Sequence, residues 1–317
     1  MKKLIFLTLC AALLAACSSP SKDVYMFTSF HEPHNEGLRL LYSHDGKLWH
    51  SVGSCIFLEA TLGQGVMRDP SIVRDKNGIF HLVWTTGWRD DLGFGYANSK
   101  DLITWSIPQF IPVMEHEPTT VNVWAPEIFY DDEEDRYIII WASTIPYRFE
   151  VGTESETNNQ RMYYTITEDF VNFTETQLFY DPGFNVIDAV IVKRAKNDYA
   201  LVLKDNSRAH RFLRMAFADN PLGPWSEAGE PFTGRYAEGP NVLKLSDYYY
   251  IFFDAYCHES NPNPCTPSYD AVKTKDFNTF VNATSEVSFP EGHKHGTIFK
   301  ASEEILKNVK KYCAEKQ

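Results

Sequence analysis

The sequence predicts an all-β protein, a five-bladed β-propeller, and two observations lead to this prediction. A short pattern (a strand end, a polar turn and a closing aromatic) recurs five times, roughly 50–70 residues apart, which is the spacing of propeller blades. Strand-like runs precede each copy, so that each repeat holds about four strands. The closing aromatics are Trp49, Trp105, Phe173, Trp225 and Phe280.

The N-terminal residues have the pattern of an export signal followed by an anchor. Lys2 and Lys3 precede an apolar run from Leu4 to Leu14. The LAAC segment that ends at Cys17 resembles the lipobox of bacterial lipoproteins. We therefore expect a signal peptide over residues 1–16, lipidation of Cys17, and a polar tether over residues 17–23. Such a protein is held at the cell envelope, in the periplasmic or the cell-surface leaflet, without spanning the membrane. A cleaved soluble protein is the alternative.

Four blades follow from runs of alternating and β-branched residues. Their inner strands are expected in DPSIV from residue 69, PEIFYD from 126, AVIVKR from 189 and NVLKL from 241. Their fourth strands are expected at the closing aromatics Trp105, Phe173, Trp225 and Phe280.

The first blade lacks an inner strand of its own. It has VYMFTSF (24–30), LRLLYSH (38–44) and LWHSV (48–52), and the segment HGTIFKA from His295 supplies the missing strand. Pairing the two chain ends in one blade closes the ring and removes an exposed sheet edge. The propeller is therefore expected over residues 24–301, with a short charged helical tail over residues 302–317.

Four cysteines remain once those of the export signal are set aside, an even number for an oxidising compartment. Cys257 and Cys265 could close a small loop, and Cys55 and Cys313 would then tie the chain ends together. Four free buried thiols are the alternative. No CxxC or His-x-Cys spacing suggests structural zinc.

The charge balance limits the partners. The formal charge of −12 becomes about −14 when Lys2 and Lys3 are removed with the signal. A surface this acidic disfavours nucleic acid and anionic polymers, whereas a neutral polysaccharide is compatible with it. We expect no nucleic-acid partner, and a monomer.

An ionisable residue stands at or close to the start of each expected inner strand. These strands line the central channel, so residues at their starts converge on one face, and the five residues are Asp69, Glu127, Asp188, Glu238 and His295. Unpaired buried carboxylates cost several kcal/mol, so this pattern indicates a chemical site. Polar channel residues solvated by trapped water are the alternative.

Five short motifs resemble those of one enzyme family. Arg68-Asp69-Pro70-Ser71-Ile72, Ile187-Asp188-Ala189 and Glu238-Gly239-Pro240 resemble the three signature motifs of glycoside hydrolase family 43. Trp124-Ala125-Pro126-Glu127-Ile128 resembles its WAP-containing segment, and His293-Lys294-His295-Gly296 its late His-Gly segment. The resemblance covers residues 24–300, in the order of the family and on its five-bladed fold.

This resemblance implies an inverting glycoside hydrolase. Asp69 would be the general base, Glu238 the general acid, and Asp188 the residue that orients the acid and tunes its pKa. The two reacting carboxyls would lie about 6.5–9.5 Å apart, to leave room for a water. Burial and the Asp188 carboxylate are expected to raise the pKa of Glu238. No cofactor is required. Calcium in the channel, reached by His295 through water, and a structural role for His295 are the two alternatives here.

The residues expected to bind substrate are Trp88, Trp124, Glu127, Arg235, Tyr256 and His295, with Trp124 as a platform for a sugar ring. The long loop 145–160 would narrow the mouth into a pocket and favour exo-action. The activity expected first is α-L-arabinofuranosidase acting on plant polysaccharide or oligosaccharide, with β-xylosidase or exo-galactosidase of the same family as alternatives.

Two rival functions belong to other classes. A retaining fructan hydrolase would carry Asn-Asp-Pro and Glu-Cys motifs, where this sequence has Arg-Asp-Pro and Glu-Gly-Pro. A non-catalytic glycan-binding propeller would be indicated by the loss of one carboxylate, and all three are present.

Overall fold

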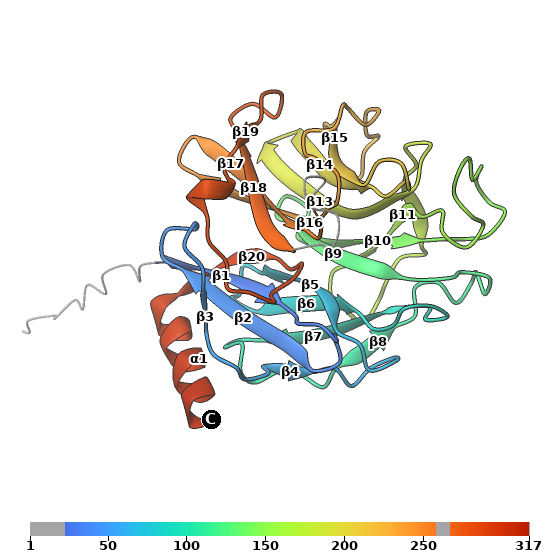
Figure 1. Ribbon diagram of the computed structural model, residues 1–317. Helices are drawn as coiled ribbons and strands as arrows, with labels where there is room; N and C mark the ends of the chain where they lie inside the picture. The colour runs from blue at the N-terminus through green and yellow to red at the C-terminus, as the bar shows by residue number, and fades with distance from the viewer. Residues whose placement is uncertain (1–22, 258–266, 317) are drawn as a thin grey trace, which may run out of the picture.

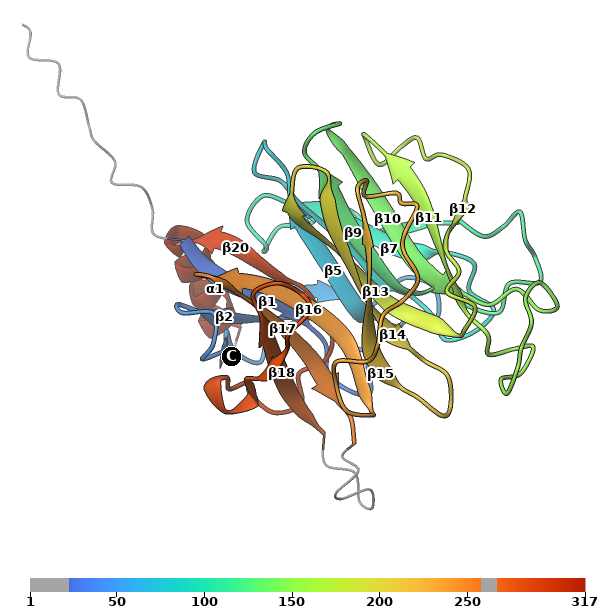
Figure 2. The ribbon, with the colours of Figure 1, turned by 90° about the horizontal axis from the view of Figure 1, so that it is seen from above.

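Five sheets surround a central axis in the computed structural model, which describes residues 23–257 and 267–316 (Figures 1 and 2). This confirms the five-bladed β-propeller. The expected signal peptide, the lipidation site Cys17 and the expected disulfide partner Cys265 lie outside the described residues.

The blades follow one another in chain order. Blade I holds β20 (Ile298–Ser302), β1 (Asp23–Ser29), β2 (Gly37–Ser43) and β3 (His50–Ser51), with β4 (Leu58–Glu59) paired to β2. Blade II holds β5 (Arg68–Arg74), β6 (Phe80–Thr85), β7 (Phe94–Ser99) and β8 (Gln109–Ile111). Blade III holds β9 (Trp124–Asp131), β10 (Arg136–Ser143), β11 (Arg161–Thr167) and β12 (Gln177–Tyr180). Blade IV holds β13 (Val186–Ala195), β14 (Asp198–Asp205) and β15 (Phe212–Ala218). Blade V holds β16 (Ala237–Leu245), β17 (Tyr248–Ala255), β18 (Ser268–Thr274) and β19 (Val281–Asn282), followed by the 3-10 turn η1 (Thr284–Glu286).

The two ends of the chain close the ring in blade I. Strand β20 pairs antiparallel with β1, and the register joins Asp23 with Ser302 and Phe27 with Ile298. The innermost strand of this blade therefore comes from the C-terminal part of the chain, as the sequence predicts.

The fourth strands differ from the prediction. The closing aromatics belong to turns, and β8, β12 and β19 begin after Trp105, Phe173 and Phe280. Blade IV has three strands in the described residues, because the segment after Trp225 follows β15 through isolated bonds such as Ser226 N to Phe217 O. A cis peptide bond before Pro224 precedes that segment.

Four of the repeated turns share one set of hydrogen bonds. In blade II, Ser99 Oγ accepts from Leu102 N at 2.9 Å, and Asp101 Oδ1 accepts from Ile103 N and Thr104 N. The residue in the place of Leu102 has a positive φ in each of the four turns. Short polar side chains stabilise such turns by satisfying backbone donors, which explains why Ser or Thr followed by Asp recurs. The other three turns begin at Ser43, Thr167 and Thr274.

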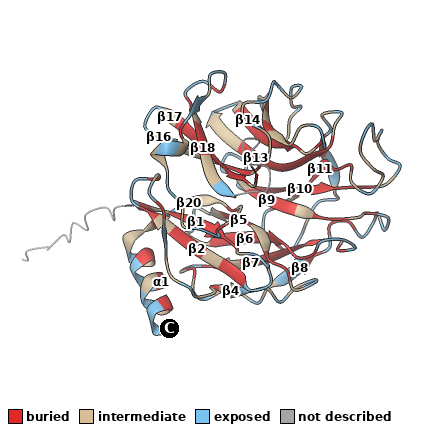
Figure 3. Cartoon of the chain, viewed as in Figure 1, coloured by how far each residue is buried: buried red, intermediate tan, exposed pale blue. Residues whose placement is uncertain are grey.

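Apolar clusters fill the spaces between neighbouring blades. Along β10, Ile139 and Trp141 pack toward blade II, while Ile138 and Ile140 pack toward blade IV. This follows the two-residue period of a strand, whose successive side chains point to opposite faces of the sheet. Figure 3 shows that the middle strands are buried along most of their length.

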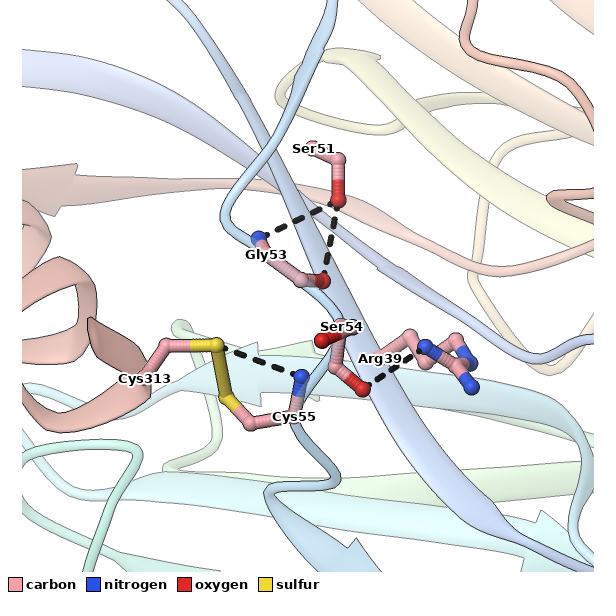
Figure 4. The surroundings of a disulfide bond; sticks show 6 residues. All are labelled: Arg39, Ser51, Gly53, Ser54, Cys55 and Cys313. Carbon is pink, nitrogen blue, oxygen red and sulfur yellow. Dashed lines mark hydrogen bonds between the residues drawn. A yellow bond between two sulfur atoms is a disulfide. The ribbon is translucent and has the colours of Figure 1, made fainter. Parts of the chain in front are cut away.

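The C-terminal helix α1 (Glu303–Glu315) covers the outer side of blade I. Ser302 caps it by accepting from Ile305 N, and Leu306, Val309 and Cys313 bury one face against the cluster of blades I and II. A disulfide joins Cys313 to Cys55, which follows β3 (Figure 4). Cys257 is also disulfide-bonded. Among the described residues, no helix is long and apolar enough to cross a membrane.

Candidate active site

A β-bulge occurs at the same place in four inner strands. In each case two residues of the inner strand oppose one residue of the second strand: Asp69-Pro70, Ala125-Pro126, Asp188-Ala189 and Gly239-Pro240. The first residue of each pair has a positive φ, between 46° and 56°. Bulges re-aim side chains and are common beside functional sites. Here they turn the starts of the inner strands toward the channel mouth.

In three of these four blades, the residue of the second strand that pairs just before the bulge also faces this mouth. These residues are Thr85 opposite Arg68, Lys204 opposite Ile187, and Asp254 opposite Glu238. All three line the same cavity as the bulge residues Asp69, Ala125 and Asp188. The register therefore brings polar groups from two strands of blades II, IV and V to one place.

A cavity of about 250 Å³ lies at this mouth. This is below the range typical for drug-sized ligands, and it suits a single sugar unit. Its lining residues are Arg68, Asp69, Thr85, Trp88, Trp124, Ala125, Ile187, Asp188, Lys204, Asn206, Glu238, Asp254 and His295. The three carboxylates expected to be catalytic thus share one pocket with His295, Trp88 and Trp124.

Asp69 is held as a carboxylate. Thr85 Oγ1 donates to its Oδ2 at 2.9 Å, and His295 Nδ1 lies 3.2 Å from its Oδ1. Burial favours the neutral acid, but His295 and the charge of Arg68 outweigh it and lower the pKa of Asp69. Burial likewise opposes the charged form of His295, yet the contact with Asp69 raises the pKa of His295 to about 9. The pair is therefore an imidazolium and a carboxylate at neutral pH.

Glu238 differs from the sequence prediction. Lys204 Nζ lies 2.7 Å from Glu238 Oε2, and both are at the pocket wall. Burial favours the neutral carboxyl, but the Lys204 ammonium outweighs it, so the pKa of Glu238 is lowered. The expectation of a raised pKa was wrong because a cation on the second strand of the preceding blade was not foreseen.

Asp188, and not Glu238, has a raised pKa. Burial is the main cause, and the nearby Glu238 and Asp69 carboxylates add to it against His295 and Lys204. Asp188 Oδ2 accepts from Gly239 N at 3.2 Å, which ties Asp188 to the backbone beside Glu238. Asp254 accepts from His295 N at 3.0 Å, and its pKa is raised to about 7, mainly by burial. Two protonatable carboxyls therefore flank the Glu238 carboxylate.

Two indole rings form one side of the rim. Trp124 Nε1 donates to Trp88 O at 2.6 Å, and the two rings meet edge to face. The Arg68 guanidinium lies 4.6 Å from the Trp88 ring centroid and is bound to Glu32 at 2.6 Å. Trp88 remains 43% exposed, so an apolar ring face is available at the mouth.

Three of the residues expected to bind substrate do not line this pocket. Glu127 lies beyond the bulge, in the place that Ser71 and Asn241 hold in other blades, and it lines the opposite part of the channel. Burial raises its pKa to about 7. Arg235 donates to His210 O at 3.2 Å. Tyr256 stands behind Lys204, with its ring centroid 5.2 Å from Nζ.

The metal prediction receives no support from the donors around His295. His295 Nδ1 is paired with Asp69, and the described part of the chain contains no group of three or more His, Cys, Asp or Glu side chains suited to a metal ion. Calcium in the channel stays a prediction.

The sequence reasoning missed Lys204, Asp254, Thr85, Arg68 and Asn206. Arg68 stands in a quoted motif, but it was not assigned a role. Lys204 and Asp254 each sit at or near the end of a second strand, in YALVLKD and YYYIFFDAY. A charged residue that ends an otherwise apolar strand is the signal that could have found them, once the inner strands had been aligned at their bulges.

Fold and site together define a class: a five-bladed propeller with an acidic pocket on its axis. The chain belongs to the glycosyl hydrolase family related to family 43, because the model described as a probable glycosyl hydrolase domain matches residues 21–305. The resemblance to family 43 drawn from the sequence motifs is thereby confirmed.

One curated relative is an α-L-arabinofuranosidase of Bifidobacterium longum subsp. longum. It is 24% identical over 319 aligned residues, which cover 79% of this chain and 30% of that protein. This chain therefore spans less than a third of the length of that relative.

Solved structures share the fold. The catalytic domain of a family 62 α-L-arabinofuranosidase from Coprinopsis cinerea has a TM-score of 0.51 at 14% identity, covering 73% of this chain and 70% of that chain. A Bacillus subtilis arabinanase has a TM-score of 0.51 at 16% identity, covering 74% and 80%. An exo-β-1,3-galactanase from Clostridium thermocellum has a TM-score of 0.57 at 14% identity, covering 86% and 64%. Likeness at these identities shows the fold alone.

Proposed function

We propose that this protein is an inverting, exo-acting glycoside hydrolase that removes terminal α-L-arabinofuranosyl units from plant polysaccharide or its fragments. The observation that carries the proposal is the convergence of Asp69, Asp188 and Glu238 on one small axial pocket. Their chain belongs to a family whose model describes a glycosyl hydrolase domain.

The paired roles of base and acid are assigned to Asp69 and Glu238. Asp69 is kept ionised by His295, which suits a base that takes a proton from water. The water oxygen attacks the anomeric carbon while the glycosidic bond breaks, and Glu238 gives its proton to the leaving oxygen. The product sugar then has the opposite anomeric configuration. Each turnover leaves Asp69 protonated and Glu238 ionised, and exchange with solvent restores both.

Asp188 is assigned a supporting role beside Glu238, the proposed acid. It is tied to Gly239 N, one residue from Glu238, and its carboxyl is the more readily protonated of the two. Asp188 therefore fixes the peptide that carries the acid and holds a proton in its immediate surroundings.

The choice of sugar and of exo-action has separate support. The cavity suits one sugar unit, and Trp88 offers an exposed ring on which that sugar or its neighbour can stack. Loop 145–160 stands on the same side, where Arg89 Nη1 donates to Thr157 O. The Bifidobacterium longum relative is named an α-L-arabinofuranosidase, which favours that sugar.

The cellular setting is proposed from the sequence. A lipid on Cys17 would hold the enzyme at the cell envelope, and its partner there would be a neutral plant-type polysaccharide or oligosaccharide. A monomer satisfies this proposal, because all the residues named above come from one chain.

The test compares Glu238→Gln and Asp69→Asn with the wild-type protein on arabinan, arabinoxylan, xylo-oligosaccharide, galactan and an aryl arabinofuranoside with a good leaving group. On natural glycans each variant should lose about 10²–10⁴-fold in kcat/KM. On the aryl substrate Glu238→Gln should lose much less, because that leaving group departs without a proton, whereas Asp69→Asn should lose as much as before.

The control for this test is Glu134→Gln, which removes a carboxylate from an exposed turn. It should keep wild-type activity. Proton NMR of the first product should show the inverted anomer. A retained anomer, or a Glu238→Gln variant as active as wild type on arabinan, would contradict the proposal. Binding of these glycans without hydrolysis would favour a glycan-binding propeller.

A further inference from the structure

Lys204 is a buried cation in the wall of the proposed hydrolytic pocket. Its side chain is 4% exposed, and it projects from the end of β14 at the position that pairs with Ile187. Its ammonium lies 2.7 Å from Glu238 Oε2 and 5.2 Å from the centroid of the Tyr256 ring. Glu238 belongs to the next blade, so this contact joins blades IV and V at the mouth.

This placement needs an explanation beyond packing. Burying an ammonium group costs free energy unless it is closely paired, and a well-packed apolar residue often serves stability equally well. The partner here is the carboxyl to which the proposed reaction assigns proton donation. A cation at hydrogen-bond distance restrains that side chain and favours the form that has already lost its proton.

We propose that Lys204 is a positioning residue for the hydrolytic reaction: its ammonium anchors the Glu238 side chain and sets the pH range in which that carboxyl can donate a proton. The inference rests on the proposed glycosidase function. It adds a residue of β14 to the three carboxyls, and it assigns the pH range of activity to a contact between two blades.

Other charged groups face Glu238 and Lys204, and none replaces this contact. Arg68 and Lys294 also favour the Glu238 carboxylate, but more weakly than Lys204. Asp188 and Tyr256 also bear on the pKa of Lys204, which is raised against the effect of burial. Asp69, Asp254 and His295 complete this cluster. They influence the pKa of Asp188 or of one another.

The direction of the pH effect follows from the charge. With Lys204 present, protonated Glu238 and ionised Asp69 coexist only at low pH or in a minor fraction of molecules. Removing the ammonium raises the pKa of Glu238, because burial then acts without its main opponent. Protonated Glu238 then persists to higher pH, so the optimum of kcat/KM must move upward.

The experiment measures kcat/KM from pH 4 to pH 9 for wild type, Lys204→Met, Lys204→Arg and the control Lys273→Met. Lys273 pairs with Glu286 on blade V, so the control removes the same charge from a surface ion pair. We expect Lys204→Met to lose about a hundredfold at its optimum, and that optimum to rise by about one to two pH units, since a close opposite charge shifts a carboxyl pKa by about that amount.

The Arg variant separates charge from geometry. Lys204→Arg keeps the cation but changes its shape, so it should lose activity while its optimum stays near that of wild type. Lys273→Met should match wild type in both respects. An unmoved optimum in Lys204→Met, or an equal shift in both Lys204 variants, overturns the proposal.

A stability measurement reports on the same contact without substrate. Glu238 has a lowered pKa in the folded protein, so the pair stabilises the fold above the unfolded pKa of about 4.3 and loses this contribution as pH falls through the folded value. The loss of Tm in Lys204→Met should therefore be larger at pH 7 than at pH 4. An equal loss at both pH values overturns the proposal. A wild type that hydrolyses no glycan refutes the proposed function, and the inference with it, even if this pH dependence of Tm is found.

Discussion

Gly239 shows how closely the pocket is built at the scale of single residues. It follows Glu238 directly, has φ +56°, and donates its N–H to Asp188. A Cβ at this position would lie 2.5 Å from Cγ of His295, the residue that pairs with Asp69. A side chain here would therefore disturb the partner of the proposed base as well as the backbone beside the proposed acid.

Gly239→Ala should lower kcat/KM by about a hundredfold, because displacement of His295 by about 1 Å is enough for such a loss. Gly183→Ala is the control: Gly183 has φ +79°, and a Cβ there meets nothing within 4 Å. Both variants should lose about 1 kcal/mol of stability to backbone strain, but only Gly239→Ala should lose activity. Glycan hydrolysis and thermal melts of both variants check this. Equal activity of the two would show that the His295 ring tolerates the contact.

Individual site residues were predictable where a motif carried them. Asp69, Asp188, Glu238, His295 and Trp124 stand in the quoted motifs, Trp88 was expected to bind substrate without one, and the structure places all six at the pocket. Glu127 was wrongly expected in the pocket, because its distance in sequence from the closing aromatic does not reveal the bulge. The bulge inserts one extra residue into β9 before Glu127. Lys204 could not be assigned from spacing alone, since its contact with Glu238 depends on how blades IV and V pack.

At the scale of elements, α1 and the segment that follows β3, which contains Cys55, are held together by more than packing. The disulfide links residues 258 positions apart, and Cys55 N donates to Cys313 Sγ (Figure 4). Nearby, Arg39 Nη1 donates to Ser54 O at 3.1 Å, so the segment around Cys55 is also tied to β2. The helix therefore has a covalent connection to the blade that closes the ring.

The double variant Cys55→Ser/Cys313→Ser should lose about 2–5 kcal/mol of stability, the usual cost of removing a native disulfide. Activity at 25 °C should stay near wild type, because neither cysteine lines the pocket. Melts with and without reductant check this: reductant should lower the Tm of wild type further than that of the double variant. A double variant as stable as wild type would mean that α1 stays docked by its apolar face alone.

Elements with strong periodicity were predicted, and short ones were not. The long second strands such as β10 and β14 coincide with the apolar runs RYIIIWAS and YALVLKD, which are rich in strand-forming residues. The fourth strands β8, β12 and β19 have two to four residues and few buried side chains, so no sequence pattern marks them. Their position is set by the strands they pair with.

The whole molecule depends on the pairing of β1 with β20. Phe299 and Ala301 of β20 lie in the same apolar cluster as Val24 and Met26 of β1, together with residues of blade II and α1. Removing β20 would expose the edge of β1 and open this cluster. The ring was predictable from the sequence because blade I lacked an inner strand and the last segment had the pattern of one.

A chain that ends at Gly296 should lose its cooperative thermal transition, because it lacks β20 and the ring stays open. A chain that ends at Ser302 keeps β20 but lacks α1, and it should melt cooperatively at a lower temperature than wild type. Both lack Cys313, so the disulfide does not distinguish them. Circular dichroism melts check the pair. Equal transitions in both would show that blade I folds without its inner strand.

The antiparallel pairing in blade I also fixes the direction from which the chain enters the propeller. The pocket lies where the inner strands begin, whereas Asp23 pairs with Ser302, at the far end of β20. An anchor that precedes Asp23 in the chain would therefore be attached at the end of the propeller opposite the pocket. A lipid on Cys17 would leave at most about 20 Å of chain before the fold begins. The enzyme would then stand on the membrane with its mouth turned outward, where a long glycan can approach without meeting the bilayer.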